Sequence, residues 1–455
     1  MNRGALLRQR RFHGCAGAIG LRSGILHQEK CEPQCHDLLI GTLPARRESD
    51  KPDIILNLMR WWILALLFFA TLINYMDRTI FAVLVPAMRG ELHIDDRIYG
   101  YLTGAFLGAY TVGYLVMGRV VDRLGTKAGF AVSAGMWSIA AGLTATAGSA
   151  LQLGGFRGLL GFAEAGNFPS AIKGVAEWFP AEQRALATGL FNSGSNLAQV
   201  VGPPVFVAVE HAFGWRTCFL LTASLGGLWL LFWWMTYRTP PKVEVEEKIV
   251  KISYMEAVRY KQTWGFAIAK FLTDSAWWFY LFWLPLCLHD QRHMKDRDYA
   301  RALSIIYFVA CFGSMGGGWL SGFLMKRGWT KSKARKTAMF ICAAAMPIAA
   351  TGVIVPSATL AVALFSLATS AHQGFSANLF TTTSDVFPKS ALGSVNGIGG
   401  CMGGLGGVIF SAIVPGFLVK FVGYTPLFMM MSSFYLIALL VLHKLMGDLE
   451  PIATS

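Results

Sequence analysis

The sequence predicts an all-α polytopic membrane protein with twelve transmembrane helices in two pseudo-symmetric six-helix bundles. The first observation is the composition: 54% of the 455 residues are hydrophobic and only 15% are charged, whereas a soluble domain carries about 25% charged residues. The second is the recurrence of apolar runs long enough to cross a bilayer, which takes about 20 residues each. The third is an echo of short motifs between the two halves of the chain. A water-soluble domain is therefore excluded.

Residues 1–58 differ from everything that follows. They hold scattered arginines and no sustained apolar run, so they lack the apolar core of about 7–15 residues that a secretory signal needs. We predict a leader without homology, either disordered or the result of a start assigned upstream of Met59. Cys31, Cys35 and His36 match a zinc-binding spacing only weakly, and neither a metal nor a cofactor is expected.

Twelve apolar runs then follow, each long enough to span the hydrocarbon core of a membrane. They lie near residues 61–84, 99–121, 128–148, 151–174, 186–210, 216–236, 264–287, 301–324, 337–356, 360–382, 393–420 and 425–445. A polar stretch, residues 239–262, is predicted to be a central cytoplasmic loop. It divides a first bundle, residues 59–238, from a second bundle, residues 263–448, and residues 449–455 form a tail.

The basic loops predict the orientation. Most Lys and Arg between the runs lie in "GRVVDRLGTK", in the central stretch and in "KRGWTKSKARK", which all fall on one side. The positive-inside rule assigns that side, and with it both termini, to the cytoplasm. The basic segment "HDQRHMKDRDYAR" falls on the other side and disagrees with the rule. Because the basic residues lie in short loops, the net charge of +14 reflects topology and not a nucleic-acid partner.

The two halves repeat each other. "EWFP" at Glu177 returns as "DVFP" at Asp385, 208 positions later, and "GRVVDRLG" has a diverged counterpart in "GGWLSGFLMKRG". Two six-helix halves with a substrate site at the midplane are typical of secondary transporters. A membrane enzyme would need a nucleophile and base or a metal constellation, and no such pattern stands out in the sequence.

Ionisable residues inside the apolar runs mark a candidate substrate site, because each costs about 2.5–3.5 kcal/mol at the bilayer centre. Arg157 and Glu164 are seven positions apart, close to two helical turns, so they share a helix face. At 1.5 Å per residue, Arg78 and Arg157 both come to lie about 9 Å from the outer surface. Since guanidinium groups bind carboxylates in a bidentate fork, we predict that the two arginines clamp an anion. The alternative is that Arg157 only neutralises Glu164 or Asp77.

Glu164 and Asp77 are the predicted proton-coupling residues. Burial favours the protonated form of a carboxyl group, and a neighbouring arginine favours the charged form. A substrate anion that occupies the arginine would therefore promote protonation of the carboxylate, which is a route to proton–anion symport. Lys270 and Asp274, four positions apart, are predicted to form an ion pair within one helix, with a role in the cavity as the alternative.

The second half presents neutral polar residues where the first half presents charge. With the offset of 208 positions, Glu164 corresponds to His372 in "SAHQGFSANLF". Ligands rich in hydroxyl groups need such neutral donors and acceptors, and the candidates are His372, Gln373, Ser376 and Asn378. Hydrogen bonds that pack helices together are the alternative for Gln373 and Asn378. The aromatic run Trp277–Tyr280 is a candidate wall of the same cavity.

The loop "GRVVDRLGTK" resembles the signature loop between spans two and three of the major facilitator superfamily. It matches at Gly118, Asp122, Arg123, Gly125 and Lys127, with a valine at position 120 in place of the more usual leucine. The resemblance implies that these residues help to hold the cytoplasmic gate closed in the outward-open state.

"NYMDR", "FRGLLGFAEAGNFPS", "EWFPAEQRALATGLFNSGSNLA", "HQGFSANLFTTTSDVFPKSALGSV" and "RGWTKSKARKTAM" are similar to the anion:cation symporter family, and within it to the bacterial hexuronate transporters. The similarity covers about residues 59–447. It implies a monomeric carrier of the bacterial inner membrane that imports glucuronate or galacturonate with protons by alternating access. The family's binding and coupling residues fall on Tyr75, Asp77, Arg78, Arg157 and Glu164. The alternatives are an importer of galactonate, glucarate or another organic anion, and a membrane sensor that has lost transport.

Overall fold

The computed structural model describes residues 50–240, 252–288, 296–414, 418 and 421–452. Met1–Asp53 separates from a compact unit, Ile54–Ser455, which contains almost all of the described residues. Most of the predicted leader, including the cysteine and histidine pattern at residues 31–36, lies outside the described residues. The described part of the chain is helical almost throughout and contains no strand.

The first half of the compact unit is formed by six helices. They are α1 (Asp50–Leu92), α2 (Asp96–Thr144), α3 (Ala150–Glu164), α4 (Asn167–Trp178), α5 (Ala181–Phe213) and α6 (Trp215–Thr236). α2 contains both the second and the third predicted spans, which join across a kink at Gly125, where φ is 79°. This left-handed backbone conformation favours glycine. The fourth predicted span is divided into α3 and α4 by a break at Ala165 and Gly166.

The second half begins with a short helix and continues with longer ones. They are α7 (Tyr254–Arg259), α8 (Lys261–Leu286), α9 (Asp296–Lys326), α10 (Lys331–Ala350), η2 (Thr351–Val353), α11 (Ala358–Val386), α12 (Leu392–Gly407), η3 (Val408–Ile413) and α14 (Tyr424–Met446). α10 starts at Lys331, well before the predicted residue 337. The basic cluster looked like a loop, but Arg335 is fully buried and paired with Asp385, so the helix can extend into it.

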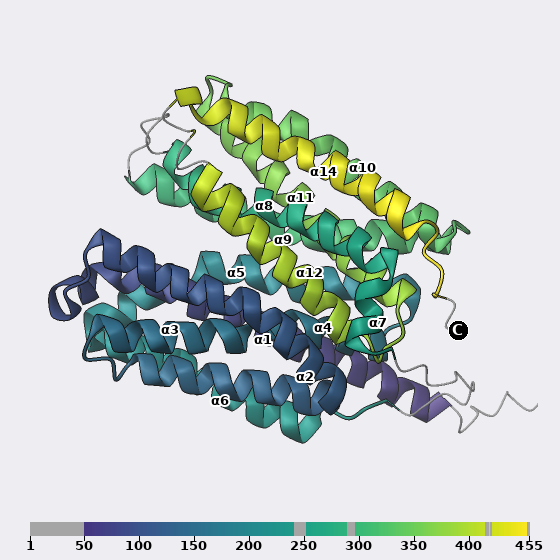
Figure 1. Ribbon diagram of the computed structural model, residues 1–455, viewed down its shortest axis with the longest axis horizontal. Helices are drawn as coiled ribbons and strands as arrows, with labels where there is room; N and C mark the ends of the chain where they lie inside the picture. The colour runs from purple at the N-terminus through teal and green to yellow at the C-terminus, as the bar shows by residue number, and fades with distance from the viewer. Residues whose placement is uncertain (1–49, 241–251, 289–295, 415–417, 419–420, 453–455) are drawn as a thin grey trace, which may run out of the picture. The chain divides into compact units, whose positions relative to one another are not determined.

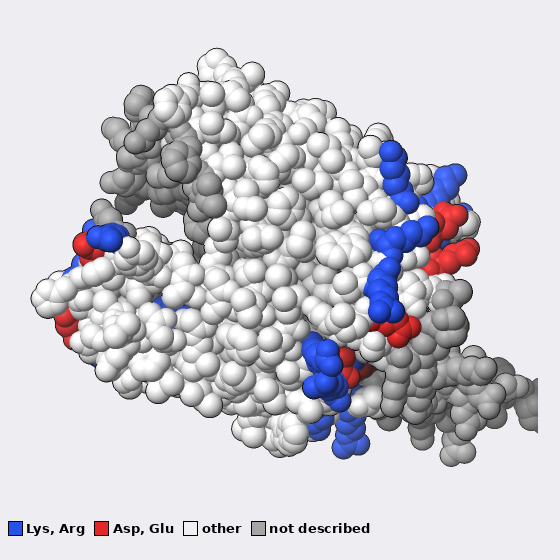
Figure 2. Space-filling view, in the orientation of Figure 1, with Lys and Arg blue, Asp and Glu red and all other residues white. Residues whose placement is uncertain are grey.

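Figure 1 shows α1–α6 grouped together and α8–α14 grouped beside them. The groups meet where α5 packs on α9 and where α2 packs on α12. On the face in Figure 2, charged residues gather at two opposite ends, and the surface between them is almost entirely uncharged. Seven helices in the described ranges are long and apolar enough to cross a membrane. One of these is α2, which covers two predicted spans, so the number of twelve stays a prediction.

Candidate functional site

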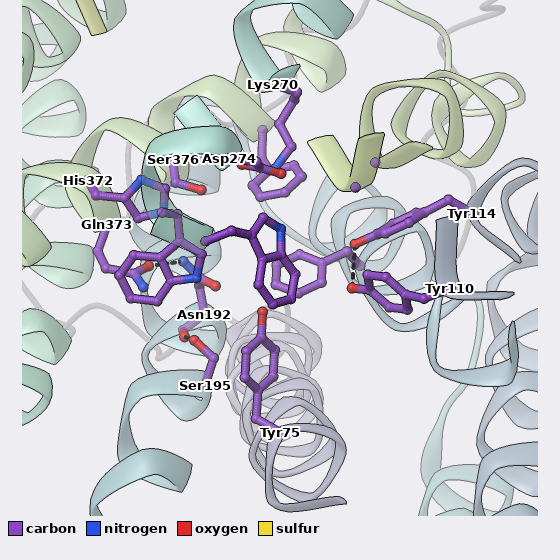
Figure 3. Close-up of a pocket in the computed structure, with 16 residues that line it drawn as sticks. Tyr75, Tyr110, Tyr114, Asn192, Ser195, Lys270, Asp274, His372, Gln373 and Ser376 are labelled. Carbon is purple, nitrogen blue, oxygen red and sulfur yellow. Dashed lines mark hydrogen bonds and ion pairs between the residues drawn. The ribbon is translucent and has the colours of Figure 1, made fainter. Parts of the chain in front are cut away.

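A small polar cavity of about 40 Å³ lies where the two halves meet (Figure 3). We call it the central cavity. This volume is far below the range of about 300–1,000 Å³ typical of small-molecule sites, so the cavity has to widen before it can hold a ligand the size of a sugar acid. The first half contributes Tyr75, Tyr110, Tyr114, Phe168, Asn192 and Ser195. The second half contributes Lys270, Asp274, Trp277, Trp278, His372, Gln373, Ser376, Phe380, Gly400 and Gly404.

Lys270 and Asp274 form the predicted ion pair within α8, which is confirmed, and both also line the cavity. The Lys270 Nζ lies 2.6 Å from Asp274 Oδ2 and donates a hydrogen bond of 2.8 Å to Oδ1. The ammonium also lies 4.2 Å from the centre of the Phe380 ring on α11. Figure 3 shows this pair on the side of the cavity opposite Tyr75. The spacing of four residues in the sequence therefore predicted the ion pair, and the fold places both residues in the cavity wall.

His372 is held in a fixed orientation on α11. Its ring stacks on Trp277, with centroids 4.5 Å apart and planes inclined by 10°. Its Nδ1 is hydrogen-bonded to the Tyr435 hydroxyl at 2.6 Å. Trp277 and Trp278 of the predicted aromatic run line the cavity, whereas Phe279 and Tyr280 pack against Phe428 of α14.

Gln373 connects the two halves at the cavity. Its side-chain oxygen accepts a hydrogen bond of 2.6 Å from Asn192, and its side-chain nitrogen donates one of 3.0 Å to Asn196. Both asparagines belong to α5. Asn378, by contrast, donates to the carbonyl oxygens of Gly317 and Gly374 and does not line the cavity. The packing alternative therefore describes Asn378, while Gln373 combines packing with a position in the wall.

Arg78 and Glu164 form a buried ion pair just behind the cavity wall. Arg78 Nε lies 2.7 Å from Glu164 Oε2, and their side chains are 10% and 0% exposed. A second guanidinium nitrogen donates to Asn74 at 2.9 Å. The guanidinium lies 4.5 Å and 4.3 Å from the ring centres of Tyr75 and Tyr110, two residues of the wall. Arg78 is thus one aromatic layer away from the cavity.

Arg157 does not reach the cavity in this conformation, whereas the predicted anion clamp requires both Arg78 and Arg157 to face the anion. It is 3% exposed and lies between the rings of Phe81 and Phe106, at 4.3 Å and 4.5 Å. It does not line the cavity, and within the described residues its Nε and one terminal nitrogen have no hydrogen-bond partner. Asp77 is likewise buried, and both its carboxylate oxygens lack a hydrogen bond in the described part of the chain. Glu164 pairs with Arg78, and not with Arg157.

The predicted gate loop contacts the second half at the start of α12. The Asp122 carboxylate accepts hydrogen bonds of 2.9 Å and 2.6 Å from the backbone N–H groups of Gly393 and Ser394, in the first turn of α12. These groups have no partner within their helix, and the helix dipole favours an anion there. Lys173 adds an ion pair of 3.1 Å to Asp122. Gly118 faces the Gly393 carbonyl so closely that any side chain would collide with it.

The other gate-loop residues shape the same end of the molecule. Gly125 provides the kink, and the Lys127 carbonyl accepts a hydrogen bond of 3.0 Å from Trp233, whereas Arg123 is exposed. A second contact between the halves lies on α5 and α11, where Arg184 donates to the Ser384 carbonyl at 2.7 Å. This end is the one that the basic loops assign to the cytoplasm.

Several wall residues were missed from the sequence. Tyr110 and Tyr114, whose hydroxyls are 2.9 Å apart, look like ordinary aromatic residues of an apolar run. Asn192 had a detectable signal, because Asn192, Asn196 and Gln199 recur at spacings of four and three on one face of α5. The described residues contain no group of three His, Cys, Asp or Glu side chains that could hold a metal.

Comparisons with known proteins agree with this architecture. The profile of the Major Facilitator Superfamily matches residues 67–411. The hexuronate transporter of Escherichia coli K12 is 31% identical over 410 residues, covering 86% of this chain and 94% of that protein. The galacturonate transporter of Dickeya chrysanthemi is 32% identical over 286 residues, 59% and 83% of the two chains. The solved structure of the proton:xylose symporter XylE has a TM-score of 0.71 at 13% identity, covering 87% of this chain and 97% of that one.

Proposed function

The chain belongs to the major facilitator superfamily, and we propose that it is a secondary active transporter that imports a sugar-acid anion with protons. The proposed substrate is a hexuronate such as glucuronate or galacturonate. The proposed setting is the bacterial inner membrane, with a monomeric carrier and both termini in the cytoplasm. Support comes from relatives that are transporters of organic anions and from the chemistry of the central cavity.

The observation that carries this proposal is the buried Arg78–Glu164 pair beside the cavity. A guanidinium in a protein does not lose its charge, so the positive group is permanent. Glu164 has one oxygen on Arg78 and, within the described residues, one oxygen without a hydrogen bond. A carboxylate in this position can change partner and protonation state without large movements of the backbone.

The proposed coupling step is an exchange of partners. A carboxylate that enters the cavity competes with Glu164 for Arg78, with Tyr75 and Tyr110 as the aromatic layer that must shift. Once Arg78 has turned to the substrate, burial favours the protonated form of Glu164. Substrate and proton are then bound together. Arg157 and Asp77, both buried in the same half, are proposed to keep the local charge balanced during the exchange.

The wall of the cavity suits the body of a hexuronate. Trp277 and Trp278 provide flat apolar surfaces for the C–H faces of a sugar ring, and Asn192, Gln373 and Ser376 provide donors and acceptors for hydroxyl groups. A few placed polar groups in an aromatic site are the usual way to orient a small ligand. His372, stacked on Trp277, is proposed to contact the same ring.

Alternating access is proposed to begin from the conformation described here. The Asp122 contact with α12 and the Arg184 contact with α11 hold the two halves together at the predicted cytoplasmic end. Rocking of the halves around the central cavity would break these contacts and open that end. Gly118, Asp122, Arg123, Gly125 and Lys127 are the proposed gate residues.

Transport by purified protein in liposomes tests the function. Radiolabelled galacturonate and glucuronate are offered with the outside acidic, with and without a protonophore, and with unlabelled galactonate, galactarate or neutral galactose as competitors. We expect accumulation of a hexuronate that the protonophore abolishes and that galactose does not inhibit. Preferential inhibition by galactonate or galactarate would correct the substrate class. Accumulation that is unchanged by the protonophore would refute proton coupling.

A further inference from the structure

The cationic residue in the wall of the central cavity, Lys270, belongs to the second half of the chain. The buried charges in the sequence predict an anion site in the first half instead. Arg78 is engaged by Glu164 and Asn74 behind the aromatic layer, and Arg157 lies between two rings away from the cavity. Of the described residues that line the cavity, only Lys270 carries an ammonium or guanidinium group. Lys270 is therefore the cationic side chain that an anion would contact directly once the cavity has widened.

The environment of Lys270 leaves its ammonium group able to accept another partner. An ammonium has three N–H donors, and within the described residues its hydrogen bonds go to Asp274 alone. Phe380 supports the group from one side through its ring face at 4.2 Å. A buried cation held by one carboxylate and one ring face can receive a second carboxylate on its open side.

Asp274 is placed so that the carboxylate of a ligand can displace it from Lys270. It lies on the same helix as Lys270 and is the more exposed of the two, with side-chain exposures of 17% for Asp274 and 6% for Lys270. Its Oδ2, the oxygen 2.6 Å from Lys270 Nζ, also packs against Gly403 of α12, where any side chain would collide with the carboxylate. When one carboxylate replaces another on Lys270, the ammonium keeps a charged partner. The displaced Asp274 carboxylate, the more exposed of the pair, must then be solvated in the widened cavity, because a buried carboxylate without a partner is costly.

We propose that Lys270 binds the carboxylate of the sugar acid and that Asp274 is the group which this carboxylate displaces. The inference rests on the proposed function and deepens it by separating two tasks. Lys270 captures the anion from the cavity and sets the affinity. Arg78 and Glu164, one layer deeper, then couple the captured anion to a proton. In this captured state the substrate carboxylate lies toward α8 and the hydroxyl groups face Asn192 and Gln373. The carboxylate then leaves Lys270 and moves across the cavity to Arg78 for the exchange of partners with Glu164.

Equilibrium binding of radiolabelled galacturonate and glucuronate to the purified full-length protein tests this inference. We expect Lys270→Met to weaken binding at least about tenfold and Lys270→Arg to stay within about threefold of the unmodified protein. Asp274→Asn removes the competitor, so its binding should be equal or tighter. The double variant Lys270→Met/Asp274→Asn removes both charges of the pair, so neither is left unpaired; it should keep the normal melting temperature and still lose binding. Lys326→Met, at the exposed end of α9, is the matched control and should bind normally.

Two results would overturn the inference. Binding by the double variant within about twofold of the unmodified protein would show that Lys270 does not hold the anion. A loss of binding in Asp274→Asn as large as in Lys270→Met would show that the pair only shapes the cavity. If the unmodified protein binds neither acid, the proposed function fails first. If it binds them and the double variant does so equally, only this inference fails.

Discussion

Each half of the molecule buries one cation–carboxylate pair near the central cavity, and the two pairs are built in opposite ways. Arg78 and Glu164 are 86 positions apart and join α1 to α3 behind a layer of aromatic rings. Lys270 and Asp274 are four positions apart on α8 and face the cavity directly. We call the first pair shielded, because aromatic rings separate it from the cavity, and the second pair open, because both of its residues line the cavity. The names describe position and not exposure, since the Arg78 side chain is 10% exposed and that of Lys270 is 6% exposed.

This difference indicates a division of labour. A shielded pair exchanges protons and partners only when something in the cavity forces it to, which is useful for coupling. An open pair meets every anion that enters, which is useful for recognition. The comparison predicts that changes to the shielded pair affect transport and stability together, while changes to the open pair affect mainly affinity.

The largest effect is expected for Arg78→Met. It leaves Glu164 buried without its partner, and breaking a buried pair in this way costs about 3–5 kcal/mol. We expect uptake of hexuronate by liposomes to fall at least about a hundredfold, together with a clear drop in melting temperature. Adding Glu164→Gln should restore the melting temperature and not the uptake. Normal uptake by Arg78→Met would remove the basis for a coupling pair in the first half.

Glu164→Gln alone is expected to have the next largest effect, on energy coupling. An amide of similar shape cannot carry the proton, and Arg78 becomes free to hold the substrate. Accumulation driven by a pH gradient should drop about tenfold, while exchange of labelled for unlabelled substrate across the membrane should stay within about twofold. Both assays use the same liposome preparation. Undiminished accumulation would mean that the coupling proton is carried elsewhere.

Arg157→Lys tests whether a guanidinium plane is needed in the shielded half. The planar group of Arg157 lies between Phe81 and Phe106, and lysine cannot reproduce that stacking. Uptake should fall several-fold, in contrast to the tolerated change Lys270→Arg in the open pair. Equal tolerance at both positions would show that charge alone matters in both halves. Uptake rates at saturating substrate distinguish this from a change in affinity.

The smallest effect is expected at an exposed pair far from the cavity. Glu91 and Arg216 are 48% and 41% exposed at their side chains and lie 2.6 Å apart. Exposed pairs contribute little to stability because water and salt screen them. Glu91→Gln should leave uptake unchanged and shift the melting temperature less than either buried pair does. A loss of uptake here would show that ion pairs at the helix ends also take part in transport.

The sequence by itself determined the class of protein and the features that depend on neighbours along one helix. Apolar runs and basic loops are local signals, because hydrophobic length and charge are properties of short segments. The Lys270–Asp274 pair belongs with them, since a spacing of four places two side chains on one helix face. The positions of Arg157 and Glu164 inside an apolar run also predicted that the first half contains buried charged side chains.

Only the tertiary structure decided which of these charges meet. Glu164 reaches Arg78 and not Arg157, Asp122 binds the start of α12 from 271 positions away, and Arg335 is buried on Asp385 inside what looked like a loop. The open position of Lys270 and the shielded position of Arg78 are likewise outcomes of helix packing. The physical reason is that a contact between helices depends on their relative rotation and depth. Those are set by the fit of many side chains at once, which no single spacing in the sequence encodes.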